Sequence, residues 1–239
     1  MLVAAAVCPC PPLLVPEVAT GAAPELDAAR TACADAVGLL AAARPDRLYV
    51  VGPADGGAHG GYPAGAKGSF AGFGVDLSVR LGEGDGPAGD GRRPLPVSLA
   101  VGAWLLARAG WADAPIEGLG VDASTPADDC AATGRELAAS AGRVALLVMG
   151  DGSACRTVKA PGYLDERAAG FDAEAARALG TADVPALLAL DGGLASELLV
   201  AGRAPWQVLA GAAEGTGLDG RLLFEDAPYG VGYFVAAWS

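Results

Sequence analysis

Short apolar segments that alternate with helical segments are the feature that most limits what this chain can fold into. Residues 2–7, 47–52 and 143–149 have the length and composition of buried strands. Residues 24–40 carry apolar side chains at helical spacing, and residues 97–110 fit a buried helix. Strands that alternate with helices are typical of layered α/β proteins. The sequence therefore predicts a three-layer α/β fold around a mostly parallel or mixed sheet.

Further elements are expected along the rest of the chain. Residues 75–80 alternate as a half-exposed strand does, and residues 116–121 and 231–235 are also expected to form strands. Residues 53–74 and 82–91 are rich in glycine and lack periodicity, which predicts loops. Additional helices are predicted to start at about Thr125, Asp165, Val184, Leu194 and Pro205.

Composition limits the classes of function. With 52% hydrophobic residues and no repeat or linker, residues 1–239 are expected to form a single domain. A formal net charge of −12 repels phosphate backbones, so we expect no nucleic-acid partner. No apolar segment reaches the roughly 18 residues that a membrane span needs, and the N-terminus lacks the basic region of a signal peptide. We therefore expect a cytoplasmic protein with no membrane partner, in which the five cysteines are free thiols.

Motifs for common nucleotide and hydrolase sites are missing from the sequence. It contains no phosphate loop ending in Gly-Lys-Ser/Thr, no G-x-G-x-x-G that opens a helix, and no G-x-S-x-G elbow. The chain also has a single histidine, His59. Any mechanism that needs two imidazoles from one chain is therefore excluded.

The cysteines Cys8 and Cys10 flank Pro9 directly after the first expected strand. Ligands and catalytic groups gather at the carboxyl ends of strands in α/β sheets. Two thiols at this spacing could bind a soft metal or exchange electrons, but a closed zinc site needs four ligands and no second cysteine pair supplies them. The alternative is a rigid turn whose cysteines pack as small apolar side chains. Cys33 and Cys130 lie on apolar helical stripes and are expected in the core.

Three other residues are candidates for chemistry. His59 lies in a glycine-rich loop, where it could act as an acid/base or metal ligand on a mobile lid, or be an ordinary exposed residue. Asp151 follows the strand over residues 143–149 and could serve as a base, bind a ligand or cap a turn. Cys155 precedes Arg156, whose charge could favour the reactive thiolate.

Four segments carry a resemblance that covers most of the chain. Residues 9–18 read PCPPLLVPEV, residues 50–53 read VVGP, residues 68–74 read GSFAGFG and residues 145–153 read ALLVMGDGS. In this order they resemble segments of the class III extradiol ring-cleavage dioxygenases of the subunit-B type, a superfamily that includes the Memo-type proteins. The resemblance implies an extradiol dioxygenase subunit-B-like fold.

The resemblance also implies a non-haem Fe(II) held by two histidines and a third ligand, which chelates a catechol and O₂, with a further histidine as acid/base. Carried over residue by residue, the first two ligand positions hold Cys10 and Ala54. The acid/base position holds Ala154, or Cys155 after a slip of one residue. The late ligand would fall near residues 198–205, where residues 199–202 have no coordinating side chain. Because alanine has no lone pair to donate, ordinary iron chemistry is not expected.

We therefore expect a divergent member of this family that lacks the iron site and ring-cleavage activity and needs no cofactor. It would retain a cleft for a small aromatic or other small molecule, or for a partner. The walls of this cleft are expected to include Cys10, His59, Asp151 and Cys155.

An enzyme remains the alternative interpretation. Cys10 and His59 would then hold a metal, with Asp151 or Cys155 completing the set, or the thiols would react directly. Such a Cys/His/carboxylate set suits zinc better than oxygen-activating iron, although a residual dioxygenase activity stays open. The apolar segments around Trp206 and Trp238 could form core or the contact of a homo-oligomer.

Overall fold

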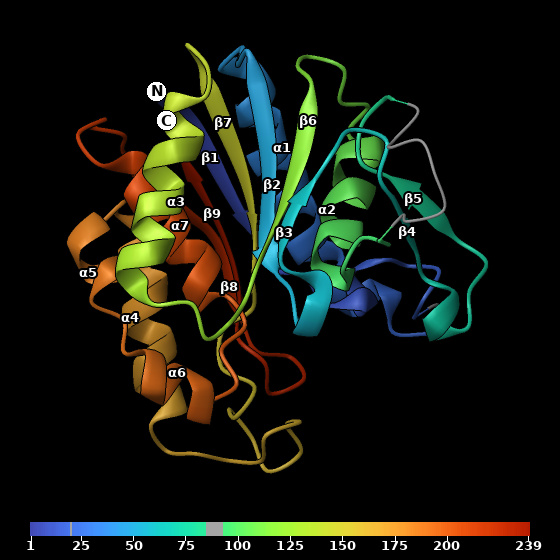
Figure 1. The fold of residues 1–239 in the computed structure, drawn as a ribbon. Helices are drawn as coiled ribbons and strands as arrows, with labels where there is room; N and C mark the ends of the chain where they lie inside the picture. The colour runs from blue at the N-terminus through green and yellow to red at the C-terminus, as the bar shows by residue number, and fades with distance from the viewer. Residues whose placement is uncertain (20, 85–92) are drawn as a thin grey trace.

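The computed structural model describes residues 1–19, 21–84 and 93–239, and its centre is a seven-stranded mixed sheet (Figure 1). The strands follow one another across the sheet in the order β3 (Gly60–Tyr62), β6 (Ile116–Val121), β2 (Arg47–Pro53), β7 (Val144–Met149), β1 (Leu2–Cys8), β9 (Tyr233–Trp238) and β8 (Gly220–Asp226). The four strands β6, β2, β7 and β1 are parallel, whereas β3 pairs antiparallel with β6, β9 with β1, and β8 with β9.

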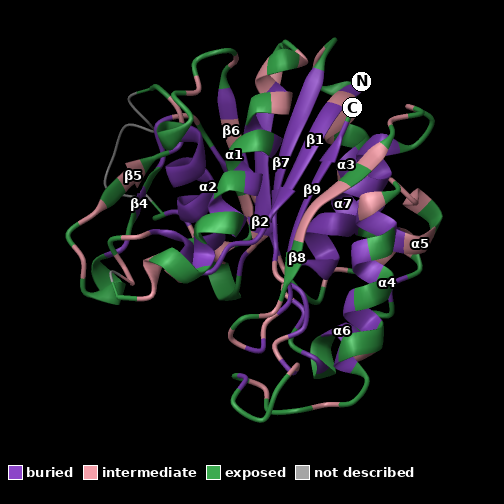
Figure 2. Ribbon diagram, turned by 180° about the vertical axis from the view of Figure 1, so that it is seen from behind, coloured by how far each residue is buried: buried purple, intermediate pink, exposed green. Residues whose placement is uncertain are grey.

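The central strands are buried on both faces, as their continuous apolar sequences predict. Along β7, Val144, Leu146 and Val148 pack into one core cluster, and the residues between them pack into the other. In Figure 2 these strands carry the colour of buried residues over most of their length. The predicted strands over residues 2–7, 47–52, 116–121 and 143–149 are thus confirmed.

Helices cover both faces of this sheet, which confirms the three-layer α/β fold (Figure 1). One face carries α1 (Asp27–Ala42) and α2 (Val97–Arg108). The other face carries α3 (Ala127–Ala139), α4 (Ala168–Gly180), α5 (Val184–Leu188), α6 (Gly192–Glu197) and α7 (Arg203–Ala213).

The helices α3 and α7 approach each other closely because both present glycine at their contact. A Cβ atom at Gly134 would overlap the backbone of Val208, and one at Gly211 would overlap the backbone of Ala131. This close packing holds α7 against the sheet, where Trp206 is fully buried. Trp238 is also fully buried, so both tryptophans belong to the core and not to a contact between copies of the chain.

The structure corrects several boundaries. The segment 53–74, expected as a loop, contains β3 and β4 (Lys67–Ser69), and β5 (Ser78–Arg80) covers only half of the strand expected over 75–80. Strand β8 was not expected from the sequence, and β9 spans Tyr233–Trp238, whereas a strand over residues 231–235 was expected. Much of the loop expected over 82–91 lies outside the described residues. The remaining short elements are the 3₁₀ helices Pro12–Leu14, Ala23–Leu26, Gly56–Ala58 and Ala71–Phe73.

All five cysteines are buried and free, including Cys33 and Cys130 on the core faces of α1 and α3. Within residues 1–19, 21–84 and 93–239, no helix is both long enough and apolar enough to cross a lipid bilayer.

Candidate functional site

A cavity of about 600 Å³ lies where the parallel strands end. Cys10 reaches it from the segment after β1, Ala54 from the residue after β2, and Ala123 from the segment after β6. The start of α2 and the segment from α6 to α7 complete the walls. The lining residues are Cys10, Pro53, Ala54, Asp55, Ala58, Pro96, Val97, Ser98, Ala123, Ala195, Ser196, Leu199, Val200 and Ala201.

The strand order explains why a cavity forms at this edge. From β1 through β2 to β6 the chain moves toward one side of the sheet, with α1 and α2 on one face. From β6 it returns through α3, on the opposite face, to β7 between β2 and β1. In open α/β sheets ligands bind outside the carboxyl ends of strands where the order reverses in this way.

Two glycines bring the walls close together. A Cβ atom at Gly52 would lie 2.8 Å from Ser98 Oγ, and one at Gly120 would lie 2.7 Å from the Cβ of Ala54. The Ser98 hydroxyl donates a hydrogen bond to the carbonyl of Pro53, at 2.6 Å. The start of α2 is thus tied to the end of β2, and the small side chain of Ala54 packs closely against Gly120 of β6.

Cys10 and Asp151, two of the predicted site residues, are in contact, although Asp151, contrary to the expectation, is not among the lining residues of the cavity. The backbone N–H of Cys10 donates to Asp151 Oδ1 at 2.8 Å, and the thiol lies 3.8 Å from Oδ2. Burial raises the pKa of Asp151 to about 6, although the hydrogen bonds from Cys10 oppose this shift. Burial and the neighbouring Asp151 carboxylate raise the pKa of the Cys10 thiol well above its usual value. The thiol therefore stays protonated at neutral pH and is a weak nucleophile.

His59 does not reach this cavity, contrary to the sequence-based expectation. Its side chain is exposed, and Nδ1 lies 3.0 Å from the carbonyl oxygen of Gly56. Arg93 donates to the carbonyls of Gly57 and His59, at 2.9 and 2.6 Å, and β3 begins at the next residue. These contacts fix the backbone on either side of His59, and His59 is not among the residues that line the cavity with Cys10.

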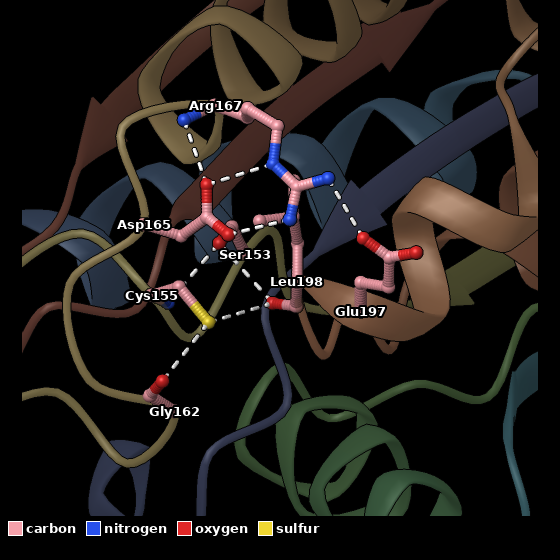
Figure 3. A network of polar contacts seen from close by, with 7 residues as sticks. All are labelled: Ser153, Cys155, Gly162, Asp165, Arg167, Glu197 and Leu198. Atoms are coloured by element: carbon pink, nitrogen blue, oxygen red, sulfur yellow. Dashed lines mark hydrogen bonds and ion pairs between the residues drawn. The ribbon is translucent and has the colours of Figure 1, made fainter.

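Cys155 is not among the lining residues of the cavity either, but it supports the cavity wall (Figure 3). Its thiol is buried and contacts the carbonyls of Leu198 and Gly162, at 3.5 and 3.6 Å. The carbonyl of Leu198 also accepts hydrogen bonds from the amide of Ala154 at 3.0 Å and from the hydroxyl of Ser153 at 3.2 Å. Cys155 therefore serves as a buried packing residue in the structure.

An ion-pair network secures the same wall from outside. Arg167 binds Asp165 at 2.6 Å on its own loop and Glu197 at 2.7 Å in α6 (Figure 3). These contacts tie the segment after β7 to α6.

A second polar contact, not indicated by the sequence, involves Asp172 of α4. Asp172 is fully buried and accepts a hydrogen bond from Ser153 N and from Arg156, both at 2.8 Å.

Leu199 presents its side chain to the cavity from a strained backbone conformation. Its φ angle is 56°, a left-handed value that residues other than glycine rarely adopt. It follows α6 in a Schellman-type turn, in which Val200 N donates to the carbonyl of Ala195 at 2.8 Å. Leu199 is also 52% exposed. Strained residues of this kind often lie at ligand sites, yet the sequence gives no signal for the strain.

The side chains around the cavity do not fit a catalytic iron site. Three protein donors with open positions beside them are needed for such a site. Cys10 is the one histidine or cysteine in the lining, and Ala54 and residues 199–201 provide only hydrocarbon. In the described part of the chain, no group of three or more His, Cys, Asp or Glu side chains is arranged to hold a metal ion.

The positions assigned by the resemblance nevertheless meet in space. Cys10 and Ala54, which the resemblance assigns to the first two ligand positions, line one cavity together with residues 199–201, the segment to which it assigns the late ligand. Ala154 lies behind this wall, where its amide binds Leu198.

Comparison with known proteins supports the fold. No family model matches the chain, and none of the curated proteins matches it. The structure is similar to that of the uncharacterized protein JW3007 from Escherichia coli K12, with a TM-score of 0.52, 18% sequence identity and coverage of 99% of each chain. At this level of identity the similarity concerns the fold alone.

Proposed function

We propose that this protein is a divergent member of the extradiol dioxygenase subunit-B-like group that binds a small, largely apolar molecule and does not cleave aromatic rings. The observation that carries the proposal is the cavity at the strand ends. The positions that resemble iron ligands surround it, but they carry Cys10, Ala54 and the apolar segment 199–201. The fold depends on apolar periodicity, whereas the activity depends on these few side chains.

The size and lining of the cavity favour a small molecule. Its volume of about 600 Å³ is within the range of roughly 300–1,000 Å³ that is common for small-molecule sites. The polar side chains in the lining are Cys10, Asp55, Ser98 and Ser196, and the others are apolar. An aromatic ring or a short hydrocarbon group would displace water from apolar walls here, which is favourable for binding.

Thiol chemistry is the second candidate because Cys10 contacts both the cavity and Asp151. The raised pKa of Cys10 speaks against it, since a nucleophilic cysteine needs a lowered pKa. A cationic partner is the usual cause of such lowering, and the nearest titratable partner of Cys10 is a carboxylate. We therefore favour ligand binding over a thiol-based enzyme.

The proposal can be tested by NMR with phenol, catechol and benzoate as probes. We expect at least one of them to shift the amide signals of lining residues such as Ala54 and Ala123. The Val97→Trp variant should abolish these shifts, because Val97 is exposed at the cavity wall and a larger side chain would fill the space. Ala173→Phe, an exposed site on α4, is the matched control and should bind as the unmodified protein does.

Two results would overturn the proposal. The first is that none of the three probes shifts the lining residues, or that the shifts survive in Val97→Trp. The second is enzymatic consumption of catechol in air after ferrous iron is added.

A further inference from the structure

A second cavity, of about 460 Å³, adjoins the first. The two cavities share Ala123, Ala195, Ser196 and Val200 as lining residues. The second cavity extends from this shared wall toward the starts of α3 and α7. A ligand in the first cavity could therefore place one end in the second.

The second cavity contains a buried arginine without an acidic partner. Arg203, the first residue of α7, is only 5% exposed and lines the cavity. Its guanidinium donates to the carbonyls of Thr125 (2.9 Å) and Ala123, and to the side-chain oxygen of Gln207 (2.7 Å). Each of these acceptors is neutral. Among the described residues, no carboxylate forms an ion pair with Arg203, and its Nε has no acceptor.

A buried guanidinium without a countercharge is energetically costly, and an anion beside it would offset that cost. The start of α3 adds to the positive potential. Pro126 and Ala127 line the cavity, and Pro126 provides no side-chain cap for the first amides of this helix. Unsatisfied amides at the start of a helix attract negative charge.

Negative charges lie at the edge of this cavity. Asp122 lines it, and its Oδ1 accepts hydrogen bonds from the amide and hydroxyl of Ser124, at 2.8 and 2.6 Å. Asp128 and Asp129 are exposed in the first turn of α3. One guanidinium opposed by these carboxylates suits a monoanion better than a doubly charged phosphate.

We propose that the second cavity binds the carboxylate of an organic acid whose apolar part occupies the first cavity. This inference rests on the proposed function and specifies the chemical class of the ligand. Arg203 would donate through its free Nε–H to one carboxylate oxygen. The apolar walls around Val97 and Leu199 would contact the hydrocarbon part.

Benzoate and benzamide test this assignment because they have nearly the same shape but differ in charge. We expect calorimetric titration to give benzoate roughly tenfold higher affinity than benzamide, the ratio expected for one charge-assisted hydrogen bond. Arg203→Gln should reduce the affinity for benzoate to that for benzamide, whereas Arg203→Lys should retain part of the preference. Arg177→Gln, which changes an exposed arginine on α4, should leave both affinities unchanged.

A second variant keeps the test decisive if Arg203→Gln does not fold. Asp122→Asn removes a negative charge and retains the oxygen that accepts from Ser124. We expect it to bind benzoate about two- to fivefold more tightly, with no change for benzamide.

Equal affinities for the two probes, or an unchanged affinity for benzoate in both Arg203→Gln and Asp122→Asn, would overturn the anion site and leave the proposed function intact. If phenol or catechol binds but neither benzoate nor benzamide does, this inference fails and the proposed function stands. If none of these probes binds, both fail.

Discussion

Replacing Asp151 with asparagine should remove a contribution to the stability of the protein that becomes less favourable as the pH rises. Burial raises the pKa of this carboxyl from 3.8 to about 6 in the folded protein. The folded state therefore binds the proton more tightly than the unfolded state does. As the pH rises above 3.8, the unfolded state gains stability from ionisation first, so the buried carboxyl progressively destabilises the fold. This penalty is complete above pH 6 and disappears as the pH falls below the unfolded value.

The size of the effect follows from the two pKa values. A difference of about two units corresponds to about 3 kcal/mol once both states are ionised. The linkage relation predicts that about 2 kcal/mol of this destabilisation develops between about pH 4.5 and 7.5. Because Asp151 is partly accessible to solvent, we expect a measured change of about 1–2 kcal/mol. The free energy of unfolding of the unmodified protein, relative to that of Asp151→Asn, should fall by this amount over the same interval.

Urea unfolding of both proteins at several pH values measures this difference. Asp165→Asn is the matched control. Arg167 lowers the pKa of Asp165 to about 2, so this carboxylate is ionised in the folded protein and very largely in the unfolded protein throughout the interval. The difference in the free energy of unfolding between Asp165→Asn and the unmodified protein should therefore remain nearly constant over this interval. The reasoning would be refuted if the free energy of unfolding of the unmodified protein, relative to that of Asp151→Asn, stayed constant or increased as the pH rises.

Three further predictions concern packing, backbone strain and the cavity. Gly134→Ala should destabilise the protein by roughly 2 kcal/mol or more in urea unfolding, because the added methyl overlaps α7. Gly38→Ala, at an exposed position on α1 with open space around it, should instead stabilise it by about 0.5–1 kcal/mol. Leu199→Gly should be more stable to urea than Leu199→Ala by about 1 kcal/mol, since alanine keeps the strain of the positive φ. The double variant Cys10→His, Ala54→His should bind ferrous iron more tightly in anaerobic titration than the unmodified protein does, because both side chains face one cavity. Equal stabilities for Gly134→Ala and Gly38→Ala, equal stabilities for Leu199→Gly and Leu199→Ala, or an unchanged iron affinity would contradict these expectations.

The central strands were predictable because their signal is local and strong. The segment Val144–Met149 is apolar throughout, and a run of this short length is typical of a strand buried on both faces. Strand β8 was missed because it is partly exposed and takes its place only by pairing with β9. Strands β3 and β4 each contain glycine, which resembles loop composition.

The location of the site could be predicted from the sequence, but only some of its lining residues could. The resemblance assigned Cys10 and Ala54 to one site, and the two residues line one cavity because each follows a parallel strand that ends at the same edge of the sheet. The position of His59 depends on Arg93, which is distant in the sequence and holds the loop backbone in place. Arg203 lies in a predominantly apolar segment, so neither periodicity nor a motif indicated that a charged side chain lines a cavity there.

The most direct test of the central claim is a crystal structure of the protein soaked with phenol and ferrous iron, with diffraction recorded at the iron absorption edge. The account predicts density for phenol in the cavity, against Val97, Leu199 and Cys10, and no anomalous iron peak among the lining side chains. An iron ion bound by protein side chains within that cavity would contradict it.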